Sequence, residues 1–335
     1  MASRDIAVNI NLMDTASDSI PLDNTSHSFK TLRRHGRSFY FASFFLGRKT
    51  AGNAARLYRF CRKIDDMVDN SKTSADQSKL RSISGDLKRR QSSDEIVQNF
   101  LALAAEEGIE IEAGLYLIDG VLSDIDTVRL KTRDDLIQYC YKVAGTVGLM
   151  MCPVLECYED KAKPHAIDLG IAMQLTNIAR DVLEDAKADR RYLPASKVGS
   201  IPYEIVNAAE AVKTDVKDAV KDLLDLADSY YKSGRTGLIY LPLRAHLSIL
   251  IASRVYSHIG EQIRARDYDI WQGRSIVPFY KKCLIALRCL SEFPVQRLKH
   301  KNISEHNTML HLNIQGFPGA NPPSSQNLDG TKHEA

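Results

Sequence analysis

The amino-acid sequence predicts an all-α protein built as a single helical domain. Proline and glycine fall mainly near the ends of apolar segments, and little of the chain alternates in the manner of a β-strand. We expect a bundle of roughly nine to eleven helices. Apolar residues recur at helical spacing in segment after segment, for example at Leu136, Cys140, Val143, Ala144, Val147 and Met151.

The expected domain covers residues 25–298 and lies between two polar ends. Residues 1–24 are aperiodic, carry acidic residues and have no apolar core of the kind found in signal peptides. Residues 299–335 gain Asn, Pro, Gly and Ser and lose helical periodicity. We therefore predict a disordered N-terminal tail over 1–24 and a disordered C-terminal tail over 299–335.

Composition and charge exclude several classes of function. The formal net charge is only +3, which does not indicate a nucleic-acid-binding protein. No stretch of about 18 uncharged apolar residues is present to span a bilayer. None of the six cysteines forms a CxxC pair, so we expect reduced, mostly buried thiols and a cytoplasmic protein.

The first motif that indicates chemistry is acidic and lies in RFCRKIDDMVDN, residues 59–70. Asp65 and Asp69 are four residues apart, so they share one face of a helix, and Asp66 flanks them. Carboxylates at this spacing repel one another. A helix that keeps them in an apolar run usually has a cation that offsets the repulsion.

The second acidic motif is MQLTNIARDVLEDAKADRRYLP, residues 173–194. Asp181 and Asp185 repeat the four-residue spacing, and Asn177 lies one turn earlier on the same face. A carboxamide and two carboxylates along one helix make a ladder of oxygen ligands.

Two such helices facing each other would offer the hard oxygen ligands that Mg²⁺ prefers, with substrate phosphates completing the shell. Bound metal would neutralise a diphosphate leaving group and assist carbocation formation. Arg62, Arg180, Arg190 and Arg191 could hold the remaining phosphate oxygens. A solvated acidic face would explain one such helix, but two in apolar sequence favour a metal site. The spacings of zinc sites and EF-hands are absent.

At these residues the sequence resembles the squalene/phytoene synthase family, and within it the bacterial-type phytoene synthases. The resemblance runs from about His35 to Cys283 and implies an isoprenoid-synthase-type helical bundle with a central cavity. Five blocks carry it in order: HGRSFYFAS (35–43), IDDMVD (64–69), YCYKVAGTVGLMM (139–151), QLTNIARDVLEDAKADRRYLP (174–194) and LPLRAHLSILIASRVYSHIGEQIRARDYDIWQGR (241–274).

The resemblance implies a prenyltransferase of carotenoid biosynthesis that condenses two geranylgeranyl diphosphates head to head to phytoene, through prephytoene diphosphate. It implies dependence on Mg²⁺ or Mn²⁺ and no nicotinamide cofactor. One alternative is a squalene, dehydrosqualene or presqualene diphosphate synthase acting on farnesyl diphosphate, since cavity depth sets the chain length. Another is a non-catalytic assembly or scaffold protein, although this sequence retains all the ladder aspartates. A chain-elongating prenyltransferase or terpene cyclase would carry a different aspartate-rich pattern.

Carried over by position, the resemblance implies roles for individual residues. Catalytic residues are Asp65, Asp69, Asp181, Asp185, Tyr139 and Arg180. Metal ligands are Asp65, Asp66, Asp69, Asn177, Asp181 and Asp185. Substrate-binding residues are His35, Arg37, Ser38, Arg62, Val143, Gly148, Gln174, Tyr256 and Arg274.

Taken alone, some of these residues have simpler explanations. Tyr139 and Tyr256 on apolar helical faces are more often core tyrosines with one satisfied hydroxyl. Gly145 and Gly148 indicate either a close approach of two helices or room for a bound chain. Asp189 departs from the family pattern, which usually has glycine there, so the loop after the second metal helix is in question.

The expected partners follow from the substrate. Polyprenyl diphosphates have nearly insoluble tails, so we expect transient contact with the inner membrane face and a peripheral location. We expect no nucleic-acid partner, and the oligomeric state is left open.

Overall fold

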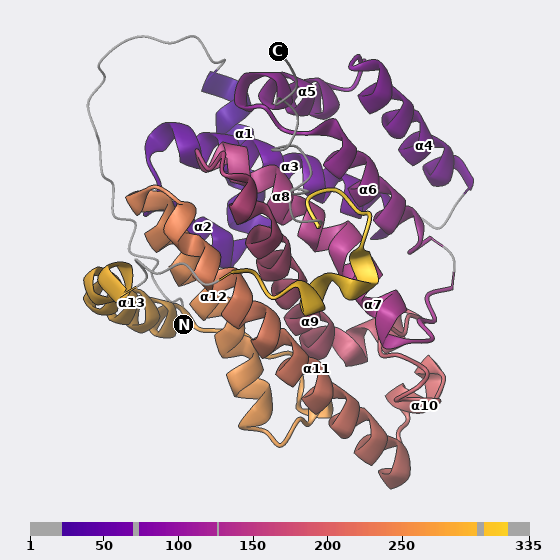
Figure 1. Cartoon of the computed structure of the whole chain (residues 1–335). Helices are drawn as coiled ribbons and strands as arrows, with labels where there is room; N and C mark the ends of the chain where they lie inside the picture. The colour runs from indigo at the N-terminus through magenta and orange to yellow at the C-terminus, as the bar shows by residue number, and fades with distance from the viewer. Residues whose placement is uncertain (1–21, 70–73, 126, 300–304, 321–335) are drawn as a thin grey trace, which may run out of the picture.

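The computed structural model describes residues 22–69, 74–125, 127–299 and 305–320 (Figure 1). Within these ranges the protein has thirteen α-helices and no β-strand, and an isolated backbone bridge joins Arg129 to Arg191. The all-α prediction is confirmed. The expected number of helices is too low, because short helices of about two turns or fewer show no complete amphipathic period.

The helices follow one another in this order: α1 (Leu22–His35), α2 (Arg37–Ser43), α3 (Arg48–Asp69), α4 (Ser74–Arg89), α5 (Glu95–Glu107), α6 (Ile111–Leu122), α7 (Arg133–Cys140), α8 (Thr146–Val154), α9 (Lys163–Lys187), α10 (Pro202–Val206), α11 (Glu210–Thr236), α12 (Leu243–Arg264) and α13 (Phe279–Lys299). A π-helical turn, η1 (Tyr141–Gly145), joins α7 to α8, and short 3₁₀ turns include η3 (Gly237–Tyr240) and η5 (Thr308–Ile314).

Local sequence signals set several helix ends. The Asp94 carboxylate accepts hydrogen bonds from two main-chain N–H groups at the start of α5. Thr132 and Asp135 form a capping box at the start of α7. Pro164 lies in the first turn of α9, where its missing N–H has no intrahelical partner to lose.

Helix α9 runs through the middle of the bundle and contacts α8, α10, α11, α12 and η1 (Figure 1). Ile171, Ala172 and Leu175 on this helix are fully buried. A helix covered by neighbours on several sides loses most of its contact with water. Its polar residues therefore have to face either a cavity or a partner.

Helix α9 packs backbone against backbone with α8 and with the adjoining turn η1. A Cβ atom built on Gly148 would lie 2.2 Å from the carbonyl oxygen of Ala166, and one on Gly170 would lie 2.3 Å from that of Ala144. Neither position has room for a side chain, since real Cβ contacts are not this short. Gly148 thus marks a close approach of helices, which is the first of the two explanations that the sequence leaves open.

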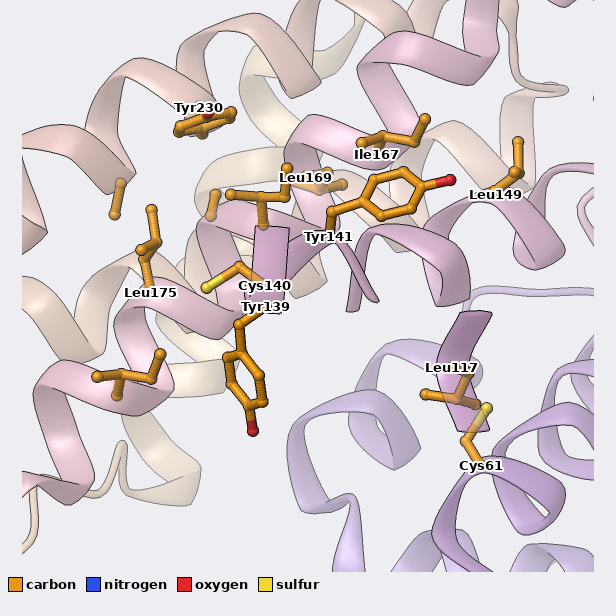
Figure 2. Packing of buried hydrophobic residues seen from close by; sticks show 14 of the residues in the cluster. Cys61, Leu117, Tyr139, Cys140, Tyr141, Leu149, Ile167, Leu169, Leu175 and Tyr230 are labelled. Carbon is orange, nitrogen blue, oxygen red and sulfur yellow. The ribbon is translucent and has the colours of Figure 1, made fainter. Parts of the chain in front are cut away.

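The hydrophobic core is one continuous cluster, part of which is seen in Figure 2. Tyr139 and Tyr141 lie two residues apart and point in different directions (Figure 2). The Tyr139 hydroxyl donates to Asp124 Oδ2 at 2.8 Å, and the Tyr141 hydroxyl donates to the carbonyl oxygen of Pro318 at 2.6 Å. Both buried hydroxyls are therefore satisfied, as burial of a tyrosine requires.

The prediction of a disordered C-terminal tail is wrong for residues 305–320, which we call the C-terminal strap. The strap crosses the bundle and reaches α7 (Figure 1). Its carbonyl groups accept hydrogen bonds from helix side chains, with the Tyr230 hydroxyl 2.8 Å from the Leu310 oxygen and Gln138 Nε2 3.1 Å from the Asn313 oxygen. Contacts of this kind leave no periodic pattern in the sequence.

At the other end, α1 begins at Leu22, so the predicted N-terminal tail extends three residues too far. Residues 1–21, 300–304 and 321–335 of the two predicted tails lie outside the described residues.

The contact between α8 and α9 predicts the effect of adding one methyl group. Gly148→Ala should lower the free energy of unfolding by about 1–3 kcal/mol, because the two helices must separate to admit it. Gly199→Ala is the matched control, since nothing lies within 4 Å of the point that a Cβ atom would occupy there. Urea denaturation followed by circular dichroism measures both, and equal stabilities would contradict the packing described.

Candidate active site

A cavity of about 620 Å³ lies between α3, α6, α8, α9 and α12. Its size is in the usual range for sites that bind small organic ligands. The wall formed by α9 changes in character along the helix, from Leu169 and Met173 to Asn177 and Asp181. These residues span roughly 18 Å of helix, at 1.5 Å per residue. The cavity can thus receive a long ligand with an apolar body and a polar, anionic end.

Most residues that the sequence analysis selected lie on this cavity. The wall includes His35, Arg62, Asp65, Tyr139, Val143, Gly148, Gln174, Asn177, Arg180, Asp181, Tyr256 and Arg274. Arg37, Ser38, Asp66 and Asp185 are not part of it. The side chain of Asp69, at the end of α3, lies outside what the structure describes.

On α3, the two neighbouring aspartates have different positions. Asp65 lines the cavity, whereas Asp66 forms an ion pair with Arg62, one turn earlier on the helix. Arg62 also reaches the cavity wall. Asp66 can therefore orient the Arg62 guanidinium for an anionic ligand, while Asp65 is the carboxylate of this pair that can reach a metal ion.

On α9, Asp181 is held by two arginines. Arg180 donates from Nε and Nη2 to the two carboxylate oxygens at 2.7 and 2.5 Å, and Arg274 donates to the same oxygens at 2.7 and 3.0 Å. Bidentate pairs of this kind are strong and directional. They also place two guanidinium groups beside the acidic ladder, where the phosphate oxygens of a ligand would lie.

Asp185, one turn further along α9, has a different environment. Burial raises its pKa to about 7, and the negative charge of Asp181 adds to the effect. A carboxyl group with such a pKa exchanges its proton easily for a metal ion near neutral pH. The Asp185 carboxyl can thus be neutralised either by a proton or by a cation bound beside it.

Asn177 offers the clearest test of whether these residues fit a metal ion. Its Oδ1 atom is buried and has no hydrogen-bond partner, while its Nδ2 group lies 3.4 Å from Gln174 Oε1. An orphaned buried carbonyl oxygen is costly unless a cation or a ligand completes it. Asn177, Asp181 and Asp185, with Asp65 from α3, make an all-oxygen donor set of the type that Mg²⁺ takes.

The structure adds Asp124, which sequence reasoning missed, to the site. Asp124 lies in the turn after α6, lines the cavity and accepts the hydrogen bond from Tyr139. The ring of Tyr192 lies 5.0 Å from that of Tyr139. Burial, and after it the charge of Asp124, raises the pKa of Tyr139. Asp124 has no acidic partner at helical spacing that could have identified it in the sequence.

The suggestion that Arg191 holds a phosphate is wrong. This buried guanidinium donates through Nη1 to the carbonyl oxygens of Val198 at 2.7 Å and Ser200 at 3.1 Å. Its hydrogen bonds hold the loop after α9 in place. Arg190, in contrast, lines the cavity.

The loop after α9 accommodates Asp189 where relatives usually have glycine. Asp189 has a φ of +58°, the left-handed region that glycine favours, and Asp is among the few other residues that tolerate it. Arg129 donates to the Asp189 carboxylate at 2.5 Å and to its carbonyl oxygen at 2.7 Å. This pair braces the turn, so the departure from the family pattern leaves the turn intact.

The family model and the relatives that match this sequence all belong to one enzyme family. The squalene/phytoene synthase family model matches residues 32–281. A 15-cis-phytoene synthase of Enterobacter agglomerans is 34% identical over 252 residues, covering 71% of this chain and 85% of that protein. A phytoene synthase of Pseudescherichia vulneris is 32% identical over 262 residues, covering 74% of this chain and 85% of that protein.

Solved structures show the same fold. A dehydrosqualene synthase in complex with a ligand matches with a TM-score of 0.72 at 24% identity, covering 82% of this chain and 97% of that one. A squalene synthase of Alicyclobacillus acidocaldarius matches with a TM-score of 0.66 at 21% identity, covering 75% and 97%. The expected isoprenoid-synthase-type bundle is confirmed.

The raised pKa of Asp185 predicts how stability depends on pH in the metal-free protein. An unfolded Asp titrates near 3.9, so the folded state holds this proton more tightly. The resulting stabilisation is complete below about pH 4 and is lost as pH rises through about 7. In EDTA, wild-type Tm should therefore fall more between pH 5 and pH 8 than the Tm of Asp185→Asn.

Asp215→Asn, at an exposed position on α11, should keep the wild-type dependence. Identical pH profiles for wild type and Asp185→Asn would refute the assignment.

Proposed function

The chain belongs to the squalene/phytoene synthase family, and we propose that it condenses two geranylgeranyl diphosphates head to head to phytoene, through prephytoene diphosphate. The observation that carries this proposal is the α9 wall of the cavity, which changes from apolar residues to an oxygen-ligand ladder flanked by arginines. The phytoene synthases that it resembles at 32–34% identity support this choice of substrate and product. The enzyme is accordingly a prenyltransferase of carotenoid biosynthesis.

Different side chains of the cavity bind the two ends of the substrate. Arg180 and Arg274 bind diphosphate oxygens, because each guanidinium already lies at the ladder and presents a planar pair of donors. Leu169, Met173 and Val143 enclose the prenyl tail and keep water from it. A cation formed on the tail would then meet a site from which water is largely excluded.

Tyr139 has a defined protonation state in this scheme. Because burial and Asp124 raise its pKa, the hydroxyl stays protonated near neutral pH. Its single hydrogen is donated to Asp124, so the hydroxyl oxygen keeps only acceptor lone pairs for the cavity. Tyr139 is thus suited to stabilise positive charge on the tail beside it.

The proposed metal ligands are Asp65, Asn177, Asp181 and Asp185, with Asp66 supporting and Asp69 completing the first motif. Mg²⁺ or Mn²⁺ bound there supplies positive charge that neutralises the diphosphate leaving group. No nicotinamide cofactor takes part, because formation of phytoene needs no reductant.

A product assay tests the reaction. With Mg²⁺ and no reductant, the purified protein should convert geranylgeranyl diphosphate to phytoene and give no comparable product from farnesyl diphosphate. Asp65→Asn should lower kcat about 100-fold or more, because charge stabilisation at the leaving group is lost. Asp215→Asn on the surface of α11 is the matched control and should leave kcat unchanged.

Squalene formed from farnesyl diphosphate only with NADPH would show that the shorter-chain alternative is right. Unchanged activity in Asp65→Asn would instead favour a mechanism outside this ladder.

We further propose that the enzyme meets its substrates at the cytoplasmic surface of a membrane, through helix α13. This helix lies at the edge of the bundle against α12 (Figure 1). Tyr280, Leu284 and Leu287 fall on one face at spacings of four and three residues and are 55–63% exposed. Such a face suits the interfacial region of a bilayer. None of the described helices is both long and apolar enough to cross one.

The neighbouring elements extend this surface. Phe279 at the start of α13 contacts the ring of Phe41 on α2 at 5.8 Å, and Phe44 at the end of α2 is 67% exposed. Arg244 lies beside the turn that follows α2. A combination of apolar and basic side chains fits an anionic lipid surface.

Vesicle sedimentation tests the surface. Replacing Leu284 and Leu287 by serine should weaken binding to anionic vesicles about tenfold or more, since each buried Leu contributes roughly 1.5 kcal/mol or more. Replacing Ile201 and Tyr203, which are also exposed but near α10, is the control. Activity in detergent should be unchanged. Equal vesicle binding by both double variants would remove α13 from the proposal.

A further inference from the structure

A second group of metal-ligand residues lies where the C-terminal strap meets α9. His165 and Asp168 are three residues apart on α9, and His306 and His311 come from the strap. His306 Nε2 lies 2.8 Å from Asp168 Oδ2, and His311 Nε2 lies 2.8 Å from Asp168 Oδ1. Asp168 is fully buried, and His165 and His311 are nearly so. None of the four belongs to the acidic ladders.

The other ring nitrogens show how two of these imidazoles are held. His165 Nδ1 lies 2.8 Å from the carbonyl oxygen of Ser233, and His311 Nδ1 lies 3.0 Å from that of Ala320. A carbonyl oxygen only accepts, so in each ring Nδ1 carries the hydrogen. In the neutral ring Nε2 then has a free lone pair. Imidazoles that bind metals are oriented by this type of hydrogen bond.

His311 therefore presents an electrostatic problem. Its Nε2 lone pair faces the Asp168 carboxylate at 2.8 Å, so two acceptors meet in the protein interior. The contact is stable only if a cation is shared between them. A proton on His311 is one solution, and a metal ion bound by both groups is the other.

The surrounding donors favour the metal ion. One donor atom each from His165, Asp168 and His306 lies within 4.8 Å of the others, so small rotations of these side chains can bring all three onto one ion. His311 lies beside these three through its contact with Asp168 and would have to move toward the ion to supply a fourth donor. Imidazole nitrogen and carboxylate oxygen are both ligands that Zn²⁺ accepts.

We propose that His165, Asp168, His306 and His311 bind one divalent ion of the zinc class, which fastens the C-terminal strap to α9. The ion differs from that of the acidic ladders, because imidazole nitrogen suits Zn²⁺ and an all-oxygen set suits Mg²⁺. The site also adjoins the main cavity, since His165 forms part of its wall at the apolar end of α9. The strap thereby supports the wall against which the prenyl tail would lie.

Zinc titration of the full chain tests this proposal. After removal of metals with a chelator, the protein should bind about one Zn²⁺ tightly, and Mg²⁺ should not compete. His306→Ala should weaken Zn²⁺ binding about 100-fold or more, whereas His258→Ala, at a histidine paired with Glu261 on α12, should not change it. Asp181→Asn should leave zinc binding intact, which separates this site from the proposed catalytic one.

Two further measurements distinguish a bound ion from a structural role alone. His306→Cys keeps a zinc ligand but loses the imidazole, so it should restore most of the affinity. Bound Zn²⁺ should also slow proteolysis within the strap of the wild-type chain and not in His306→Ala. A lack of stoichiometric binding would overturn the proposal, as would equal affinity in His306→Ala. The proposal would also be overturned if the resistance of the strap to proteolysis changed with pH but not with Zn²⁺. In that case a proton would be the cation shared by Asp168 and His311.

Discussion

Helix α9 touches α8 and the π-helical turn η1 along its backbone, where Gly148 of α8 meets the carbonyl oxygen of Ala166 and Gly170 of α9 meets that of Ala144 in η1. The contact brings the two helices as close as main chains can come, and it places the residues that follow each glycine beside one space. On α9 these residues include Met173, Asn177 and Asp181. The cavity, its apolar wall and the oxygen ladder all depend on this approach, because a wider separation would move the ladder away from the other helices.

Because α9 is central, each of its three aspartates needs compensation, and the protein uses a different means for each. Asp181 is paired with two arginines. Asp185 is compensated through a raised pKa, which lets it carry a proton until a cation takes its place. Asp168 lies against the imidazoles of His306 and His311, where the shared cation of the proposed zinc site compensates its charge. Chemistry and stability are thus coupled along a single helix.

How much of this could be read from the sequence depends on the range of the interactions. Spacing along one helix is local information, so the sequence is enough to select Asn177, Asp181 and Asp185 as candidate metal ligands. Tyr139 and Arg274 are selected only by the family resemblance. Asp124 was missed because it comes from a turn and acquires meaning only when Tyr139 contacts it.

The same limit explains the errors. The strap is held by side chains that bind its carbonyl groups over long sequence distances, so nothing periodic marks it. Arg191 follows Arg190 in the second motif and carries the same charge, yet its guanidinium donates to main-chain carbonyl oxygens. Asp189 could be flagged as a departure, but its partner Arg129 is 60 residues away in the chain.

The π-helical turn η1 affects the direction in which the lining residues of this helical segment point. The wall includes every fourth residue of this segment, namely Tyr139, Val143, Val147, Met151 and Leu155, with Ala144, Gly148 and Cys152 beside them. In a regular helix of 3.6 residues per turn, a stripe at intervals of four rotates by about 40° at each step. A wider turn absorbs part of this rotation. The single extra residue in η1 thus straightens the stripe, so that the tyrosine at its start and the apolar residues along it can border the same space.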